Sequence, residues 1–368
     1  MKAKILFFLL GFLISGCTNF EYTTEEVDNP VYHPNTQFFS YEDLSSPKFG
    51  HLIEKYRLDT IFHGETDEFK RILLLRHWIK TVIKINDFGD PYPGDGYAEQ
   101  ILDNALRGQG YHCGHFMTVQ NALMNAFGYV TRTLGAGPGG MDGSDGHHGI
   151  NEIWLNSYNK WFLSDAKYDH HFEKDGVPLS ALEIRDEYLK NKAADIVKVK
   201  GPDRIPFDID AETGYSREEN ARTYTWIEWH GYNNIFTVWP EYKDLLIMYR
   251  DDFFRNNTWI WGGKPHWAYA QPEFMKPVDE RTEIYWTPNT ISSEVLIEGK
   301  VATVKLKSDT PNLKEYQVRQ KPSTAWEKVD SAYVVNLKKK NHELVFRALN
   351  LAGVAGPEHR VIIKRKTR

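Results

Sequence analysis

The chain has 368 residues, enough for more than one folded domain and a substantial hydrophobic core. Its formal net charge is -5 and the sequence shows no basic face, which argues against binding to nucleic acid. Aromatic residues make up 14% of the chain and include 11 Trp, so some rings are candidates for a ligand surface.

The N-terminus has the pattern of an export signal. Two lysines precede an apolar run, residues 5–14, that is short for a transmembrane helix. The following Ile14-Ser15-Gly16-Cys17 resembles the lipobox of bacterial lipoproteins, which implies cleavage before Cys17 and a lipid on its sulfur. An ordinary signal peptide with a chance cysteine is the alternative. We therefore expect a signal peptide at 1–16 and a protein anchored to a membrane of the cell envelope, periplasmic or surface-exposed.

The next segments differ in character. Residues 17–46 are polar and show no lasting hydrophobic period, so we expect a tether between lipid and domain. Residues 67–85 repeat apolar side chains at helical spacing, which predicts a core helix. A loop at 87–96 and a short helix at 98–106 then precede the most distinctive stretch of the chain.

Cys113 lies in that stretch, residues 108–116, with glycines on both sides. An apolar pattern at spacings of three and four follows and ends at Gly128, which predicts a buried helix that begins near the cysteine. At a helix start, the dipole and free backbone N–H groups favour a thiolate. Because lipidation uses Cys17, Cys113 is left as an unpaired thiol and is the candidate nucleophile.

Two strand-like runs, residues 147–155 and 160–165, flank a turn and predict a β-hairpin. With a loop of two or four residues, His148 and Asp165 fall on one face of the sheet, opposite or diagonal to each other. An odd loop would send them to opposite faces. We therefore expect a His148–Asp165 pair, with His147 as the alternative histidine.

The segments around these motifs are assigned more coarsely. We expect a strand at 129–134, a flexible glycine-rich active-site loop at 135–146 without the lysine of a phosphate-binding loop, and a helix at 180–192. Residues 201–280 form an aromatic-rich extension of the core. Some of these rings must be core, and one cluster is also a candidate wall for stacking a sugar or another substrate; its members are Trp259, Trp261 and Trp267.

Residues 281–368 change character again. Short strand-like runs separated by turn signals predict a C-terminal β-sandwich; the runs are 294–297, 302–307, 315–319, 325–329, 332–337, 343–348 and 360–364. The segment 343–353 resembles the late strands of fibronectin type III or immunoglobulin-like modules.

Three of the singled-out residues have the chemistry for acyl transfer. Cleavage of an amide requires an activated nucleophile, a base that takes and returns a proton, and donors for the oxyanion. Cys113 and His148 are of the right types for the first two roles. Asp165 would hold the imidazole in one tautomer and stabilise its charged form.

The order Cys, His, Asp is that of the transglutaminase-like superfamily, and the local motifs also resemble those of the family. They are residues 110–114 before the apolar helix, His148-x-x-x-Glu152 before an apolar strand, and residues 161–165. The chain departs from the family pattern at Ile150, where Trp is frequent, and at Ala166, where Pro is common.

The resemblance implies an α+β fold with a papain-like core at residues 47–200, in which the cysteine helix packs on an antiparallel sheet that carries His148 and Asp165. The backbone N–H of Cys113 is the first candidate oxyanion donor, and the side chain of Gln109 is a second. Members include cross-linking enzymes, peptidases, other amide-processing enzymes and inactive relatives.

We therefore expect a lipid-anchored cysteine-dependent hydrolase or acyltransferase without a cofactor, acting on a peptide, glycopeptide or polysaccharide-linked substrate. One alternative is a non-catalytic surface lipoprotein that binds a glycan or peptide on the same fold. Another is a metal site, although the spacings match no zinc pattern; its ligands would come from His112, Cys113, His115, His147, His148, His170 and His171.

Overall fold

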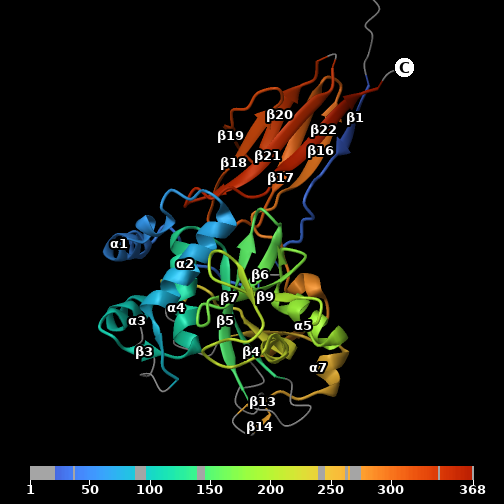
Figure 1. Ribbon diagram of the computed structural model, residues 1–368. Helices are drawn as coiled ribbons and strands as arrows, with labels where there is room; N and C mark the ends of the chain where they lie inside the picture. The colour runs from blue at the N-terminus through green and yellow to red at the C-terminus, as the bar shows by residue number, and fades with distance from the viewer. Residues whose placement is uncertain are drawn as a thin grey trace, which may run out of the picture.

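The computed structural model describes residues 21–35, 38–87, 97–138, 146–238, 245–261, 264–265, 275–338 and 340–366. The fold is α+β, as expected. One unit combines helices with mainly antiparallel sheets, and a second unit of β-strands lies at one end of the first (Figure 1).

The expected helix at 67–85 is α2, Glu68–Val82, which begins where the Asp67 side chain accepts the Lys70 backbone N–H. The helix expected at 180–192 is α5, Ala181–Asn191. The other helices of the described residues are α1 Pro47–Tyr56, α3 Tyr97–Leu106, α4 Cys113–Ala126, α6 Arg217–Arg222 and α7 Asp252–Asn256, with 3-10 turns η1 Leu58–Phe62, η3 Thr223–Thr225 and η6 Arg281–Glu283.

A six-stranded sheet in the order β15-β12-β11-β4-β5-β6 forms the centre of the α+β unit. Its strands are β4 Thr131–Gly137, β5 His148–Leu155, β6 Lys160–Ser164, β11 Trp226–His230, β12 Leu246–Tyr249 and β15 Met275–Val278. The β12–β15 pair is parallel and the others are antiparallel. The aromatic-rich segment 201–280 thus supplies half of the strands of this sheet.

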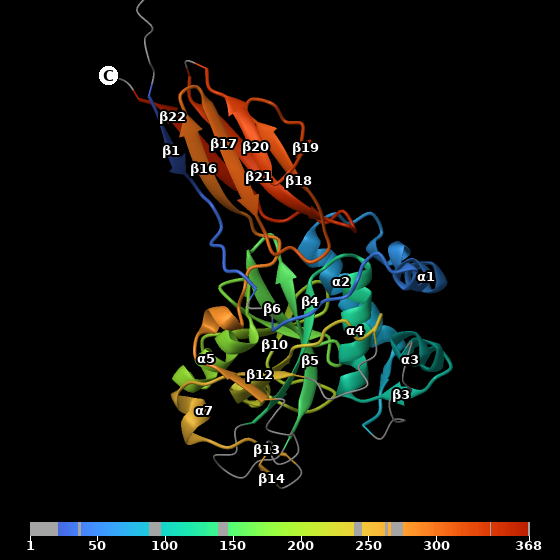
Figure 2. The ribbon, with the colours of Figure 1, turned by 180° about the vertical axis from the view of Figure 1, so that it is seen from behind.

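Helices cover both faces of the central sheet, with α2 and α4 on one side and α5 on the other (Figure 2). On the first face Ile153 and Phe162 pack with Ile72 of α2 and Met124 of α4. On the second face a different set of apolar side chains packs between the sheet and α5; it includes Leu134, Ile150, Trp154, Leu163, Leu182 and Ile184. Burial on both faces explains why the end of β5, residues 153–155, and the middle of β6, residues 161–163, are continuous apolar runs.

Smaller sheets surround this centre. The order β10-β9-β7-β8 joins β7 His170–Lys174, β8 Val177–Pro178, β9 Val197–Lys200 and β10 Ile205–Phe207. Two further pairs are β2 Lys84–Ile85 with β3 Gly110–Tyr111, and β13 Ile260–Trp261 with β14 Lys264–Pro265. A bridge between Asp165 and His170 connects the end of β6 to β7.

Two sheets pack around one hydrophobic cluster in the C-terminal unit. All seven strands expected in this part of the sequence are present: β16 Ser292–Glu298, β17 Val301–Lys307, β18 Leu313–Gln320, β19 Glu327–Val329, β20 Ala332–Asn336, β21 His342–Asn350 and β22 His359–Arg365. The resemblance to fibronectin type III or immunoglobulin-like modules stays a prediction.

The expected tether at 17–46 is wrong in part. Residues Tyr22–Glu26 form β1, which pairs antiparallel with β22 along five residues. Further on, Phe39 is buried, and the buried Glu42 carboxylate accepts the backbone N–H of Phe236 and Thr237. The reason is that the exposed edge of β22 offers unpaired backbone groups that a polar extended segment can satisfy.

Candidate active site

Cys113 is the first residue of α4, as the sequence pattern indicated. The helix is capped by His112, whose Nδ1 accepts the Gly114 backbone N–H at 3.2 Å. The rest of α4 is almost entirely buried, so the position of the thiol is fixed by core packing. Cys113 itself is partly exposed, which leaves its sulfur accessible.

Strand β5 approaches α4 closely next to this thiol. A Cβ added to Gly149 would lie 3.3 Å from Met117 Sδ and 3.4 Å from Gly114 Cα, so even the smallest side chain would be in direct contact with α4. This approach lets the Gly149 backbone N–H donate a hydrogen bond to the Cys113 sulfur.

The hairpin β5–β6 brings His148 and Asp165 together, as predicted. Its loop, residues 156–159, has four residues, and Asn151 pairs with Ser164. The same register places Asp165 beside Ile150 and diagonal to His148 on one face. His148 Nε2 donates to Asp165 Oδ2 at 2.7 Å. Because Nε2 is engaged, Nδ1 is the nitrogen that contacts the Cys113 sulfur.

The electrostatics of these groups favour a charged pair. Burial raises the pKa of the Cys113 thiol, but hydrogen bonds from His112 and His148, the charge of His148 and the Gly149 N–H together lower it to about 4. Burial lowers the pKa of His148, but Asp165 and then the thiolate raise it to about 10. His148 in turn outweighs burial and holds the pKa of Asp165 below its usual range. At neutral pH the site therefore contains a thiolate and an imidazolium.

A cavity of about 450 Å³ opens onto the thiol. Cys113, His148 and Asp165 line it together with residues from other elements, among them Lys167, Tyr168, Tyr215, Arg222 and Tyr224. A second cavity of about 720 Å³ shares Asp87, Tyr168 and Tyr215 with the first, so the two adjoin. The thiol thus lines a cavity whose volume falls within the roughly 300–1,000 Å³ typical of ligand pockets.

The alternative histidine, His147, has other neighbours. Its ring stacks on Trp259 with the centroids 5.7 Å apart, and its Nε2 lies 3.7 Å from Glu228 Oε1. Gly135 makes room for the side chains of His147 and Glu228, because a Cβ added to it would come within 2.8 Å of both. His147 therefore lines the cavity, while His148 is the histidine that contacts Asp165.

Several sequence expectations need correction or stay open. Trp259 is buried with 0% exposure and donates its Nε1–H to Gly146 O at 3.0 Å, so it belongs to the core and not to an exposed substrate wall. Only the backbone of Trp261 is described, and Trp267 lies outside the described residues. Gln109 precedes β3 and is not among the described residues that line the cavity. Its role as an oxyanion donor stays a prediction.

The expected glycine-rich loop also differs at its start. Gly135–Gly137 belong to β4, where β11 pairs with them, and residues 139–145 lie outside the described part. Sequence reasoning missed Lys167 and Tyr168 as lining residues, although both lie within three positions of Asp165. That closeness to a motif residue was the available signal.

Glu152, the last residue of the histidine motif, lies away from the thiol. Its carboxylate accepts from Arg132 at 2.7 Å and 3.1 Å, from Trp229 Nε1–H at 2.8 Å, from the Ala181 N–H at 2.8 Å and from Tyr285 OH at 3.0 Å. Glu152 and Arg132 are fully buried. This residue therefore ties β4, β5, β11 and α5 together and positions the strand that carries His148.

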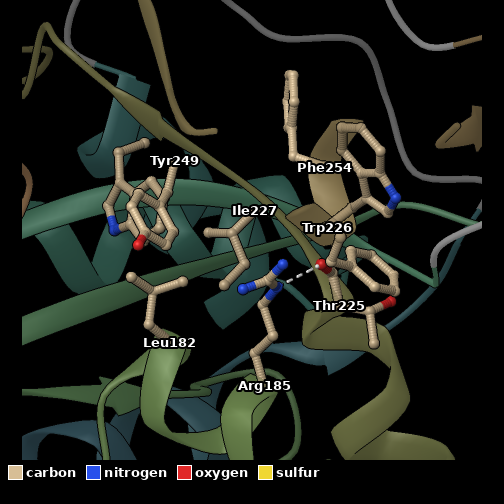
Figure 3. A pocket seen from close by; sticks show the side chains of 9 residues that line it. Leu182, Arg185, Thr225, Trp226, Ile227, Tyr249 and Phe254 are labelled. Atoms are coloured by element: carbon tan, nitrogen blue, oxygen red, sulfur yellow. Dashed lines mark hydrogen bonds between the residues drawn. The ribbon is translucent and has the colours of Figure 1, made fainter. Parts of the chain in front are cut away.

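A further cavity, beside Arg185, is unsuited to a substrate because its volume is about 10 Å³ (Figure 3). Arg185 donates there to Thr225 O at 3.0 Å. It also pairs with both oxygens of Asp251. Among the described residues, no group of three or more His, Cys, Asp or Glu is arranged to hold a metal ion. No helix in that same part of the chain is long and apolar enough to span a membrane.

Fold and site together define an α+β protein with a cysteine at a helix start and a histidine–aspartate pair on the adjoining sheet. The model of the transglutaminase-like superfamily matches residues 56–166, and this part of the chain is a domain of that superfamily. The match includes Cys113, His148 and Asp165. Members of the superfamily are usually cysteine-dependent enzymes. No curated protein matches the chain.

Proposed function

We propose that this protein is an exported, lipid-anchored thiol enzyme that hydrolyses amide bonds in a peptide, glycopeptide or related substrate. The observation that carries the proposal is the contact of His148 with both Cys113 and Asp165 on the wall of a substrate-sized cavity. The lipid anchor rests on the sequence around Cys17.

In the first half-reaction the Cys113 thiolate attacks the amide carbonyl carbon. A C–S bond forms, and the carbonyl oxygen becomes an oxyanion that the backbone N–H of Cys113 at the first turn of α4 can stabilise. The C–N bond then breaks, and His148 Nδ1 gives its proton to the leaving amine. The products of this step are a thioester on Cys113, a free amine and a neutral imidazole.

In the second half-reaction neutral His148 takes a proton from water as the water oxygen attacks the thioester carbonyl. The C–S bond breaks, a carboxylic acid leaves, and the thiolate and imidazolium return. Asp165 acts through His148: it keeps Nε2 protonated, directs Nδ1 at the sulfur and stabilises the charged ring.

Turnover of amide substrates by the purified protein tests the proposal. Peptides, glycopeptides and peptidoglycan fragments are screened as competitors of a thiol-directed activity probe, and the best competitor is then assayed as a substrate. A carboxylic acid product indicates hydrolysis, whereas a new amide formed with an added primary amine indicates transfer. A reactive Cys113 without turnover of any competitor would favour the non-catalytic binding protein instead.

A further inference from the structure

Lys167 is held rigidly beside the proposed reaction centre. It lies in the tight turn between Asp165 and His170, which exchange two backbone hydrogen bonds of 3.1 Å. The Tyr168 N–H also donates to Asp165 Oδ1 at 3.2 Å. The turn that presents the carboxylate to His148 therefore also fixes the backbone of Lys167.

The Lys167 side chain carries its charge from this turn to the cavity wall. The side chain is only 6% exposed, and Nζ lies 5.1 Å from the centre of the Tyr168 ring, which in turn stacks on His148 with centroids 5.6 Å apart. Lys167 and Cys113 line the same cavity. Burial lowers the pKa of Lys167, but Asp87 outweighs burial and raises it above its usual range, so the group is an ammonium.

The partner of this ammonium is displaceable. Nζ lies 2.6 Å from Asp87 Oδ1, but the Asp87 side chain is 63% exposed. Water and salt screen such a half-exposed pair, which contributes little stability. The other two carboxylates among the described lining residues have partners of their own: Asp165 binds His148, and Glu219 caps α6 through Ser216. Among the described residues that line the cavity, the solvated Asp87 is the carboxylate with which a substrate anion competes for Lys167.

We propose that Lys167 forms an anion-binding subsite beside the thiol, and that the enzyme selects amides with a carboxylate next to the scissile bond. This inference rests on the thiol chemistry proposed above. The buried stem of Lys167 makes the ammonium a preorganised anchor, because little side-chain freedom remains to be lost when the carboxylate binds.

Two alkylating reagents of nearly equal size but different charge test the subsite without a known substrate. Iodoacetate is an anion and iodoacetamide is neutral. The rate of Cys113 alkylation by iodoacetate divided by the rate with iodoacetamide therefore reports the cavity's preference for a carboxylate. In Lys167→Met, which keeps the length of the apolar stem, we expect this ratio to fall roughly tenfold, because one charge near the reagent is lost. Asp87→Asn should raise the ratio, since it removes the competing carboxylate.

Lys160→Met is the matched control. Lys160 also pairs with a carboxylate, Glu183, but lies at the opposite end of β6, so its loss should leave the ratio unchanged. An unchanged ratio in Lys167→Met would overturn the subsite. If that variant does not fold, as judged by circular dichroism, failure of Asp87→Asn to raise the ratio overturns it. Slow alkylation of the wild-type protein by both reagents would instead refute the thiol chemistry itself, and the subsite with it.

Discussion

Replacing Asp165 by Asn removes one charge from the site and little else. The amide has nearly the same shape, and Asp165 is held in place by its backbone bridge to His170. The change acts on His148, whose Nε2 donates to Asp165 Oδ2 at 2.7 Å in a buried setting. The thiolate–imidazolium pair should therefore weaken while the fold survives.

The size of the effect on turnover follows from the pKa of His148. This pKa rises from 6.5 to about 10, and at about 1.36 kcal/mol per unit this rise corresponds to about 5 kcal/mol. Asp165 supplies more of this stabilisation than Cys113 does. Its loss should lower the pKa of His148 strongly, because the burial that Asp165 now outweighs remains in the variant. Turnover should fall by several orders of magnitude, because an amide also favours the wrong tautomer.

The assay is the rate of Cys113 alkylation by iodoacetamide as a function of pH. The wild-type rate should rise through the pKa of the thiol near pH 4 and stay high across neutral pH. In Asp165→Asn the acid limb should move to higher pH, since a less charged His148 stabilises the thiolate less. His147→Ala is the control and should keep the wild-type profile. Identical profiles for Asp165→Asn and wild type would refute the role assigned to Asp165.

Three other perturbations test separate parts of the account. Cys113→Ala should abolish turnover while the circular dichroism spectrum stays unchanged, because a small residue at a helix start disturbs little packing; a variant that kept substantial turnover would disprove the nucleophile. Glu152→Gln should lower the free energy of unfolding in urea by about 3–5 kcal/mol, because Arg132 is left buried without its charge partner. Asp195→Asn, at an exposed position, is the control, and a urea midpoint of Glu152→Gln as high as that of the control would contradict the role of Glu152. Cys17→Ala should lose the label of a palmitate analogue that the wild type incorporates, and equal labelling of both would exclude lipidation at this residue.

The His148–Asp165 pair was predictable because its geometry is local. A hairpin with a four-residue loop fixes the register, and the period of two then fixes the faces. The start of α4 was predictable for a similar reason, since the apolar spacing after Cys113 and the glycines before it act within a few residues. The seven C-terminal strands likewise carry their own turn signals.

Features that depend on distant segments were not predictable. Strand β1 forms only because the edge of β22, more than 300 residues away, accepts it. The burial of Trp259 is decided by Trp226 and Met248, which lie on β11 and β12. The ammonium of Lys167 lines the cavity of Cys113 only because the turn after β6 folds back toward it. Composition and spacing carry no information on such contacts.

The central claim is that Cys113 forms a covalent acyl-enzyme with help from His148. Intact-protein mass spectrometry tests it most directly: the protein is mixed with an activated acyl ester, quenched in acid and weighed. We predict one acyl group per chain, mapped to Cys113, that hydroxylamine removes and that does not form in Cys113→Ala. An adduct of equal amount in Cys113→Ala, or no adduct in the wild-type protein, would contradict the account.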